Sequence, residues 1–340
     1  MRTILYIGNQ LANKNKTVTT IDTLSRLLVD FGFKVITASK KENKVARVLD
    51  MLWYIWRYRK TLDYVLIDTY STQNFYYAYL SANLCAKLDL KYIPILHGGK
   101  LPDRLKQSPN LSKTLFNRAF VNVAPSNYTK LNFEALGYSN ITCIPNTIEL
   151  KNYPFELRRF DKVKLLWVRS FSEIYNPLLA VDILKALKNK NIAAELCMVG
   201  PDVDGSLQKT KNYAESLGVA VTFTGKLSKP EWIALSKDYN MFINTTNIDN
   251  MPVSVIEAMA LGMPVISTNV GGMPFLIKNK ENGILVEPNS VQGFVKAITE
   301  AFNEVSKIEK MTLNGRQYTE QFDWNHVKKQ WFKVFSENKV

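Results

Sequence analysis

The segment NIDNMPVSVIEAMALGMPVISTNVGGMPFLI, residues 247–277, combines two acidic side chains with a change from helix-like to strand-like sequence. Asp249 and Glu257 lie eight residues apart, around a Met-Pro turn. The segment continues with the helix-like run VIEAMALG, which ends at a glycine, and with the hydrophobic run PVIST, which is typical of a buried strand. A helix followed at once by a buried strand predicts an α/β fold.

The same rhythm of strand and helix extends through both halves of the chain. The first half contains an amphipathic helix, TTIDTLSRLLVDFG, that ends at Gly32. Its strand-like runs are TILYIG, KVITAS, YVLID, KYIPILHG and VNVAPS. The second half adds KLLWVRS, AAELCMVG, VTFTG, DYNMFINTT and MPVISTN. This alternation predicts a parallel sheet in each half.

A polar stretch that contains proline, NTIELKNYPFELRRFDKVK, separates the two series and predicts a linker near residues 148–162. The chain has 340 residues, of which 46% are apolar, so it is long enough for two domains that each bury a core. We therefore expect two doubly wound, Rossmann-like domains that face a cleft. In such folds ligands bind beyond the carboxyl ends of the strands.

The cysteines and the apolar runs indicate the compartment. Cys85, Cys143 and Cys197 are far apart and form no CxxC pair, so they predict buried thiols rather than disulfides or a zinc site. No apolar run approaches the length of a membrane span, and the N-terminal run is too short for a signal peptide. We expect a cytoplasmic protein, with a peripheral place on the inner face of the membrane as a further option.

Positive charge is concentrated in the first half of the chain. Residues 1–150 carry 20 Lys and Arg against 10 Asp and Glu, a net charge of +10, whereas residues 151–340 carry 24 against 20, a net charge of +4. Such a surface favours an anionic partner: nucleic acid, anionic lipid or a phosphorylated substrate. No nucleic-acid-binding module is recognisable, so we expect no nucleic-acid partner.

Several motifs carry a resemblance to a known family. Besides residues 247–277, they are LHGGKLP, APSNYTKLNFEALGYSNITCIPN, LLWVRSFSEIYNP, LCMVGPD, VTFTGKLSKPEW, NGILVEPNS and FDWNHVKKQWFKVF. In this order the chain resembles the group 1 family of retaining glycosyltransferases with the GT-B fold. The resemblance implies an acceptor-side domain over residues 1–155, a donor-binding domain over residues 156–317, and a C-terminal helix, residues 318–340, that crosses back to the first domain.

The resemblance implies that Glu257 binds the ribose hydroxyls of a nucleotide sugar. Asp249 takes the place of a second family glutamate, near hydroxyls of the donor sugar. A carboxylate can accept hydrogen bonds from both hydroxyls of a cis-diol, which suits Glu257 to this role. The backbone leading into the helix N-terminus would hold the donor sugar and diphosphate. Its residues are Asn250, Met251, Pro252, Val253 and Ser254. The alternative is that Glu257 is a solvated helix residue and Asp249 a turn residue.

Arg169 ends the first strand of the second half, where the family has an Arg that faces the donor diphosphate. The family's Lys and Gly, about six residues later, are replaced by Tyr175 and Asn176. A phenol donates one neutral hydrogen bond, whereas a guanidinium holds two phosphate oxygens. Either backbone amides and another cation such as Lys226 compensate, or the leaving group is less strongly stabilised. The alternative for Arg169 is a structural ion pair at a strand end.

Three residues of the first half are candidates for the same ligand. Gly8 and Asn9 follow the first strand, where a glycine lets a ligand approach the backbone; an ordinary turn is the alternative. There is neither a dinucleotide fingerprint nor a P-loop. His97 ends the strand of LHGGKLP, where the family has a histidine that contacts the transferred sugar; a structural turn residue is the alternative.

Asp202 and Asp204 have the D-x-D spacing with which other glycosyltransferases hold a metal. A GT-B fold normally neutralises the diphosphate with cations and amides, so we interpret this pair as a solvated turn. We expect no metal and no cofactor, with the nucleotide-diphosphate sugar as the donor substrate.

The stretch ARVLDMLWYIWRYRK bears on the acceptor. One helical face is shared by Val48, Met51, Leu52, Ile55 and Trp56. Three cations, Arg57, Arg59 and Lys60, flank this face. Aromatic and basic residues together favour an anionic membrane surface, although most apolar helix faces belong to a core.

We therefore expect a retaining glycosyltransferase, independent of metal, that moves a sugar to a hydroxyl of a glycan or lipid-linked acceptor. Cell-surface polysaccharide or glycolipid synthesis would suit such an enzyme. Three alternatives stay open: a sugar-nucleotide epimerase, a phosphorylase, and a degenerate homologue without catalysis.

Overall fold

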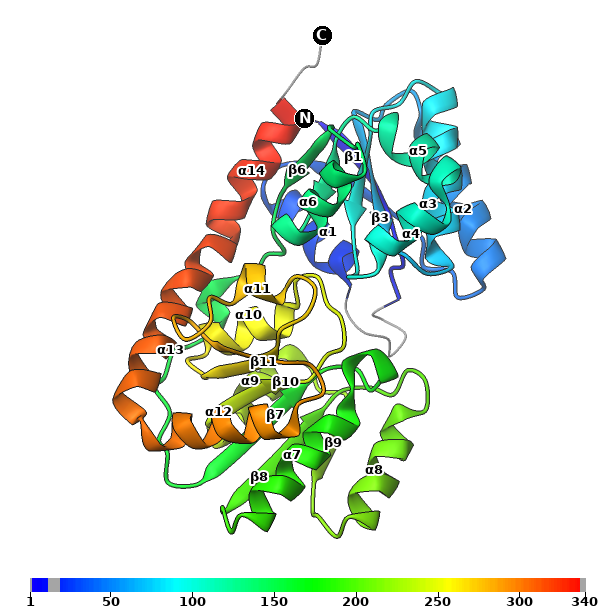
Figure 1. Ribbon diagram of the computed structural model, residues 1–340. Coiled ribbons are helices and arrows are strands. Elements are labelled where there is room, and N and C mark those ends of the chain that lie inside the picture. Colours follow the sequence, from blue (N-terminus) through cyan, green and yellow to red (C-terminus); the bar gives the residue numbers. More distant parts are fainter. Residues whose placement is uncertain (1, 12–18, 337–340) are drawn as a thin grey trace. The chain divides into compact units, whose positions relative to one another are not determined.

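The structure is a computed structural model that describes residues 2–11 and 19–336 (Figure 1). The chain divides into two compact units. Unit 1 contains residues 1–145 and 327–340, and unit 2 contains residues 146–326.

Unit 2 begins ten residues before the donor domain expected from the sequence. The reason is that the stretch after residue 145 is bonded to unit 2. The amide of Ile148 donates to the carbonyl of Phe322 at 3.0 Å, and the hydroxyl of Tyr153 donates to the carboxylate of Glu257 at 2.7 Å. The polar linker is thus a packed part of unit 2.

Unit 1 is built on a six-stranded parallel sheet in the order β2-β1-β3-β4-β5-β6. The strands are β1 Thr3–Ile7, β2 Lys34–Ala38, β3 Tyr64–Thr69, β4 Tyr92–Leu96, β5 Asn122–Ala124 and β6 Ile141–Cys143. Helices lie on both sides of the sheet (Figure 1). They are α1 Thr20–Asp30, α2 Lys44–Tyr58, α3 Asn74–Lys87, α4 Leu101–Gln107, α5 Pro109–Asn117 and α6 Asn127–Ala135.

Unit 2 is built on a second six-stranded parallel sheet, in the order β12-β11-β10-β7-β8-β9. The strands are β7 Val163–Val168, β8 Ala194–Val199, β9 Thr222–Gly225, β10 Met241–Asn244, β11 Val265–Thr268 and β12 Ile284–Val286. The helices are α7 Pro177–Asn189, α8 Ser206–Ser216, α9 Lys229–Leu235, α10 Val253–Ala260, α11 Met273–Leu276, α12 Val291–Asn303, α13 Val305–Thr319 and α14 Trp324–Ser336, the last of which continues into unit 1.

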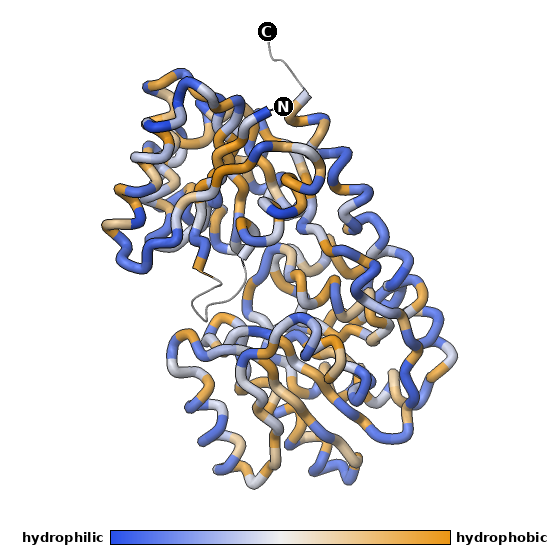
Figure 2. The backbone as a smooth tube through the Cα atoms, turned by 180° about the vertical axis from the view of Figure 1, so that it is seen from behind, coloured by the Kyte–Doolittle hydropathy of each residue, from blue (hydrophilic) through white to orange (hydrophobic). Residues whose placement is uncertain are grey.

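Both sheets have the doubly wound, Rossmann-like topology that the sequence predicts. The central strands are nearly continuous apolar runs because helices cover both faces, as β3, buried over its whole length, illustrates. Figure 2 shows these strands as hydrophobic runs inside each unit, whereas the outer helices alternate between polar and apolar residues. The strand order reverses between β1 and β3 in unit 1 and between β7 and β10 in unit 2, and ligands bind at such switch points.

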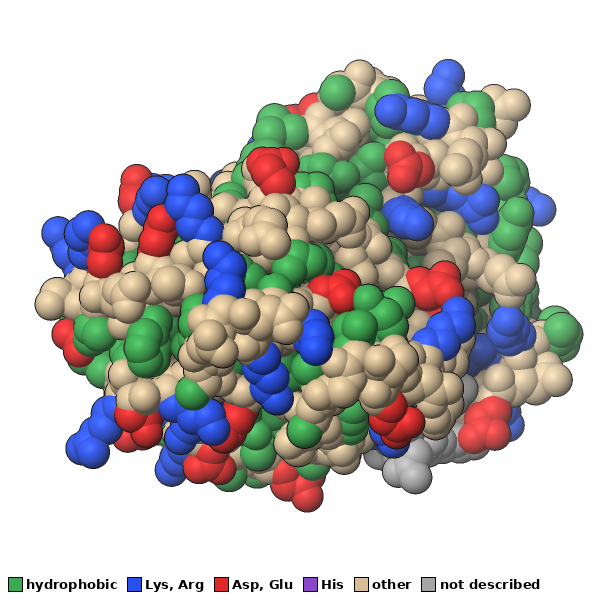
Figure 3. Space-filling model, turned by 60° about the horizontal axis from the view of Figure 1, so that its bottom comes forward, with side chains coloured by type: hydrophobic (Ala, Val, Ile, Leu, Met, Phe, Trp, Pro, Cys, Tyr) green, Lys and Arg blue, Asp and Glu red, His purple; other side chains and the backbone are tan. Residues whose placement is uncertain are grey.

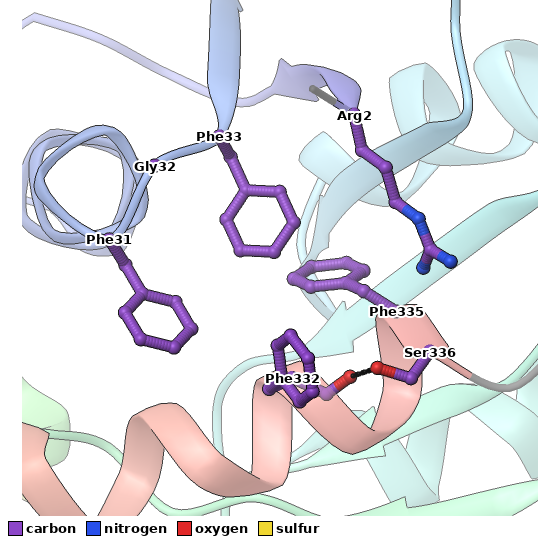
Figure 4. A pocket seen from close by; sticks show the side chains of 7 residues that line it. All are labelled: Arg2, Phe31, Gly32, Phe33, Phe332, Phe335 and Ser336. Carbon is purple, nitrogen blue, oxygen red and sulfur yellow. Dashed lines mark hydrogen bonds between the residues drawn. The ribbon is translucent and has the colours of Figure 1, made fainter.

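Helix α14 crosses back to unit 1, as expected. The hydroxyl of Tyr64 donates to the carbonyl of Phe335 at 3.1 Å, and the rings of Phe33 and Phe335 meet edge-on at 5.0 Å. A cavity of about 340 Å³ lies beside this seam (Figure 4). Its lining residues are Arg2, Phe31, Gly32, Phe33, Phe332, Phe335 and Ser336. None of the expected site residues lines it.

Two further features concern the surface. On the face drawn in Figure 3, basic and acidic side chains lie close to one another among small hydrophobic areas, so charge is locally balanced there. Within residues 2–11 and 19–336, no helix is both long enough and apolar enough to cross a membrane.

Candidate functional site

The switch point of unit 2 brings Arg169 and Asp249 together. Arg169 follows β7 and Asp249 lies in the loop between β10 and α10, and β7 and β10 are neighbours in the sheet. The guanidinium donates from Nη2 to the Asp249 carboxylate and from Nη1 to Ser254 Oγ at 3.5 Å. The two side chains are only 11% and 14% exposed. Nε of Arg169 is buried and has no hydrogen-bond partner in the described part of the chain.

Tyr175, which stands where the family has Lys, supports Arg169 instead of replacing a cation. The carbon Cζ of the Arg169 guanidinium lies 4.1 Å from the centroid of the Tyr175 ring. This is a cation–π contact, which holds the guanidinium by its flat face and leaves its edge free to donate. The sequence shows the loss of a cation at residue 175, whereas the contact of the Tyr175 ring becomes visible only in the structure.

The Gly-Gly pair of residues 271 and 272 supports the loop that carries Asp249. The amide of Gly272 donates to the Asp249 carbonyl at 2.9 Å. A Cβ atom on Gly272 would lie 1.7 Å from the Asn250 carbonyl oxygen, and one on Gly271, whose φ is +53°, would lie 2.2 Å from the Asp249 carbonyl oxygen. The glycines thus allow two backbones to touch.

The loop continues into α10 without a capping side chain at Pro252. The amide group of Asn146 donates to the carbonyl of Met251 at 2.9 Å, and the backbone N–H of Asn250 donates to the Asp249 carboxylate at 2.8 Å. Val253 and Ser254 form the first turn of α10, whose N–H groups have no intrahelical acceptor. A fixed, uncapped helix N-terminus next to Arg169 is suited to an anion.

Glu257 lies on α10 and is 2% exposed. Its Oε1 accepts from the Tyr153 hydroxyl at 2.7 Å and from the Lys229 ammonium group. Burial raises the pKa of Tyr153, and the charge of Glu257 raises it further, so Tyr153 remains a donor. Lys229 is half exposed and begins α9, three residues after Lys226, which follows β9. Lys226 was expected at this site from the sequence, whereas Lys229 and Tyr153 were not.

In unit 1, His97 is bound to a carboxylate that the sequence analysis did not single out. Nε2 of His97 donates to Oδ1 of Asp68 at 2.8 Å, and the Tyr6 hydroxyl donates to the same oxygen at 2.9 Å. The Tyr70 ring stacks on the imidazole at 4.8 Å. Asp68 is fully buried, and its Oδ2 has no hydrogen-bond partner among the described residues. Nδ1 of His97 is then the ring nitrogen left for a ligand.

Gly8 and Asn9 belong to the same cluster at the switch point of unit 1. A Cβ atom on Gly8 would lie 2.7 Å from Oδ2 of Asp68, so a side chain at this position would displace the carboxylate. The side-chain oxygen of Asn9 is buried and has no hydrogen-bond partner among the described residues. Burial raises the pKa of Tyr6, and the charge of Asp68 adds to this effect. The cluster thus combines two unpartnered buried oxygens with a held imidazole.

Asp202 accepts hydrogen bonds within its own loop, and Asp204 also ties this loop to the one that follows β7. Asp202 accepts from the amide of Gly205 at 3.0 Å, and Asp204 accepts from the hydroxyl of Ser172 at 2.7 Å and from the amide of Glu173 at 3.1 Å. Burial acts to raise the pKa of Asp204, but these bonds and those from Ser206 outweigh it and lower the pKa to about 2. The geometry is that of a turn.

The helical face that the sequence offered to a membrane lies largely in the core. Met51 and Ile55 are fully buried, and Val48 packs against the same cluster, whereas Trp56 is exposed. This corrects the assignment of one shared face, because Trp56 lies on the opposite side of α2.

The chain is similar to known glycosyltransferases in sequence and in fold. Residues 151–318, about half of the chain, match the family model of the group 1 glycosyl transferases. Glycogen synthase of Mycobacterium tuberculosis is 24% identical over 194 residues, which are 56% of this chain and 47% of that protein. D-inositol 3-phosphate glycosyltransferase of Rhodococcus jostii is 26% identical over 162 residues, 44% of this chain and 36% of that protein. The chain thus spans less than half the length of these curated relatives.

Solved structures share the fold over nearly the whole chain. Sucrose-phosphate synthase of Thermosynechococcus elongatus superposes with a TM-score of 0.81 at 16% identity and covers 98% of both chains. HepE of Anabaena, in complex with UDP and glucose, superposes with a TM-score of 0.78 at 14% identity, covering 99% of this chain and all of the other. The chain therefore belongs to the group 1 family of glycosyltransferases and has the GT-B fold.

Proposed function

We propose that the protein is a retaining glycosyltransferase that moves a sugar from a nucleotide-diphosphate sugar to a hydroxyl of a glycan or lipid-linked acceptor. The observation that carries this proposal is the meeting of Arg169, Asp249 and the uncapped start of α10 at the switch point of unit 2. Solved neighbours support the substrate class, since structures of HepE contain UDP or UDP-glucose and one of TarM contains UDP with a glycosylated glycerol.

In this proposal unit 2 binds the donor. Glu257 accepts from the ribose hydroxyls, with Lys229 holding its charge in place. The backbone of residues 250–254 binds the diphosphate, and Arg169 donates to it through the edge that Tyr175 leaves open. Asp249, held by Arg169, accepts from hydroxyls of the donor sugar. Lys226, which follows β9, and Lys229 add positive charge at the carboxyl edge of the same sheet.

The roles of unit 1 follow from the Asp68 cluster. We assign His97 to a hydroxyl of the transferred sugar, with Asp68 fixing the tautomer that leaves Nδ1 as the acceptor. Gly8 and Asn9 lie beside this cluster and contact the same ligand. The buried Asp68 gives His97 the rigid orientation that such a contact requires.

The acceptor hydroxyl attacks the anomeric carbon from the face that the diphosphate leaves, through an oxocarbenium-like transition state. A phosphate oxygen of the leaving group takes the hydroxyl proton, so the bond to the diphosphate breaks as the new glycosidic bond forms. Arg169 and the N–H groups of α10 stabilise the negative charge that develops on the diphosphate. Because these groups already supply positive charge, we propose that no metal is needed.

The test is a screen of nucleotide sugars by thermal shift, followed by a transfer assay. The best donor raises the melting temperature by mass action. Release of nucleoside diphosphate that requires an acceptor supports a transferase, whereas conversion of the donor without an acceptor indicates an epimerase. Dependence on inorganic phosphate indicates a phosphorylase, and loss of activity in a chelator with recovery in magnesium overturns metal independence.

A lipid-linked acceptor also places unit 1 at an anionic membrane surface on the cytoplasmic side. This part of the proposal rests on the net charge of +10 over residues 1–150. Nucleic acid is the competing anion, and binding to DNA or RNA in a gel shift at physiological salt would favour it.

A further inference from the structure

Helix α2 has a second apolar face, opposite to the one in the core. The side chains of this face follow one another at intervals of four, four and three residues, so they form one stripe along the helix. They are Val45, Leu49, Trp53 and Trp56, with 69%, 62%, 51% and 52% of their surface exposed. The opposite side of the helix carries the fully buried Met51 and Ile55. Four large apolar side chains are thus presented to the outside of unit 1, where α2 lies (Figure 1).

Basic residues border this stripe. Between residues 40 and 60 there are seven Lys and Arg, of which only Arg47 is buried, against two acidic residues, Glu42 and Asp50. The carboxylate of Asp50 accepts from the hydroxyl of Ser39, so it is held within the fold. At the end of the helix, the Arg59 guanidinium lies 4.4 Å from the Trp56 ring centroid. An aromatic side chain with a cation beside it suits the boundary between apolar and charged layers.

The neighbouring helix α3 extends the surface. It packs against α2 and exposes Tyr76 and Leu80 by 50% and 42%. The Arg104 guanidinium lies 5.2 Å from the Tyr76 ring centroid. The helix next to α2 thus also exposes apolar side chains, one of which has a cation beside it.

We infer that the outer face of α2, made by Val45, Leu49, Trp53 and Trp56, is where the protein docks on an anionic lipid surface. This inference rests on the proposed function, whose lipid-linked acceptor lies in such a surface. Trp and aliphatic side chains enter the headgroup boundary while Arg57, Arg59 and Lys60 meet the lipid charge. A second copy of the chain is a poorer occupant, because it would bring an equally basic border against this one.

The tryptophans offer a direct readout. The protein has six, and the four outside the stripe are at most 9% exposed: Trp167, Trp232, Trp324 and Trp331. Quenching of fluorescence by acrylamide therefore reports chiefly on Trp53 and Trp56 in the full-length protein. Vesicles of phosphatidylglycerol and phosphatidylcholine should shift the emission to the blue and protect it from acrylamide, whereas vesicles of phosphatidylcholine alone should do neither.

Co-sedimentation with the same vesicles tests the residues. Trp53→Ser combined with Trp56→Ser should weaken binding by about ten-fold or more, and so should charge reversal of Arg57, Arg59 and Lys60 to Glu. Leu313→Ser is the matched control, since Leu313 is 49% exposed on α13 of unit 2. Binding that these variants leave unchanged overturns the inference.

Two further measurements separate this inference from the proposed function. Binding of nucleoside diphosphate by the double Trp variant should equal that of the wild type, because no donor residue is changed. Failure of donor binding in the wild type with vesicle binding intact would remove the proposed function and leave the docking face. Sedimentation equilibrium without lipid should show no dimer, and a dimer that the double Trp variant loses would assign the stripe to self-association instead.

Discussion

Arg169 and Asp249 are 80 residues apart in sequence and form a nearly buried ion pair at the switch point of unit 2. The pair joins the end of β7 to the loop that precedes α10, and it rests on the ring of Tyr175. A departure from the family pattern at residue 175 thus becomes a support for the arginine.

Removal of the Tyr175 ring should lower kcat more than it lowers donor affinity. Tyr175→Ala deletes the face on which Arg169 lies, so the guanidinium loses its orientation toward the leaving diphosphate. We expect a fall in kcat of about ten-fold, the scale of a partly desolvated cation–π contact. Tyr175→Phe keeps the ring and serves as the control, with activity close to wild type. Equal losses in both variants, measured by steady-state kinetics on folded protein, would contradict the contact's role.

Substitution in the pair Gly271–Gly272 should disturb the loop that carries Asp249. Gly272→Ala places a Cβ atom 1.7 Å from the Asn250 carbonyl oxygen, so the donor loop must shift. A shift of about 1 Å can cost about 10²-fold in kcat/KM. Gly218→Ala is the comparison, because Gly218 has φ of +62° but open space around it. It should lose stability without losing kcat/KM per folded molecule, and normal kcat/KM in Gly272→Ala would refute the steric argument.

Asp68 should act on transfer through His97. Asp68→Asn removes the charge that holds the imidazole, and Tyr6→Phe removes one of the donors to that carboxylate. We expect the first to lower kcat by about ten-fold and the second by less, with nucleoside diphosphate affinity unchanged. The double variant Asp68→Asn with His97→Ala should be no slower than His97→Ala alone. Additive losses would mean that Asp68 acts independently of His97.

Asp204 should stabilise the fold at neutral pH and not in strong acid. Its pKa in the folded protein is about 2, below that of an unfolded aspartate, which is about 3.9. Its contribution is therefore complete above pH of about 4 and is lost as the pH falls toward 2. Wild type should exceed Asp204→Asn in unfolding free energy at pH 7, and the difference should vanish near pH 2. Urea denaturation across this range measures it; a chelator that abolished the difference at pH 7 would indicate a metal instead.

The central strands of both sheets could be predicted from the sequence because they are buried on both faces and appear as continuous apolar runs. The edge strands β6 and β12 were not predicted, because they are three residues long and only partly buried. Arg169 and the residues of the loop before α10 could be predicted as site residues, because their motifs lie close to strand ends. The residues that contact these site residues could not be predicted, because the pairing of the strands brings them together from distant parts of the sequence. The backbone pairing of β3 and β4 sets Thr69 opposite Leu96, which places His97 next to Asp68 although 29 residues separate them.

The outer face of α2 shows a second limit of the sequence. A helix with apolar residues on two sides has no single periodic pattern that says which side enters the core. The sequence analysis therefore joined Trp56 to Met51 and Ile55, whereas the packing of α2 buries the last two and exposes the first. Tyr153 and Lys229 were missed for a related reason, since their contacts with Glu257 span 104 and 28 residues.

The central claim is that Glu257 holds the ribose of a nucleotide donor. Calorimetric titration with nucleoside diphosphates and with nucleotide sugars, beginning with UDP and UDP-glucose, tests this claim most directly. Glu257→Gln should weaken binding by roughly 1.5–3 kcal/mol, the range for a hydrogen bond to a charged group. The control is Glu300→Gln, which also removes one carboxylate charge, but from an exposed position on α12. This variant should bind the donor as the wild type does. Donor affinity in well-folded Glu257→Gln equal to that of Glu300→Gln would contradict the account.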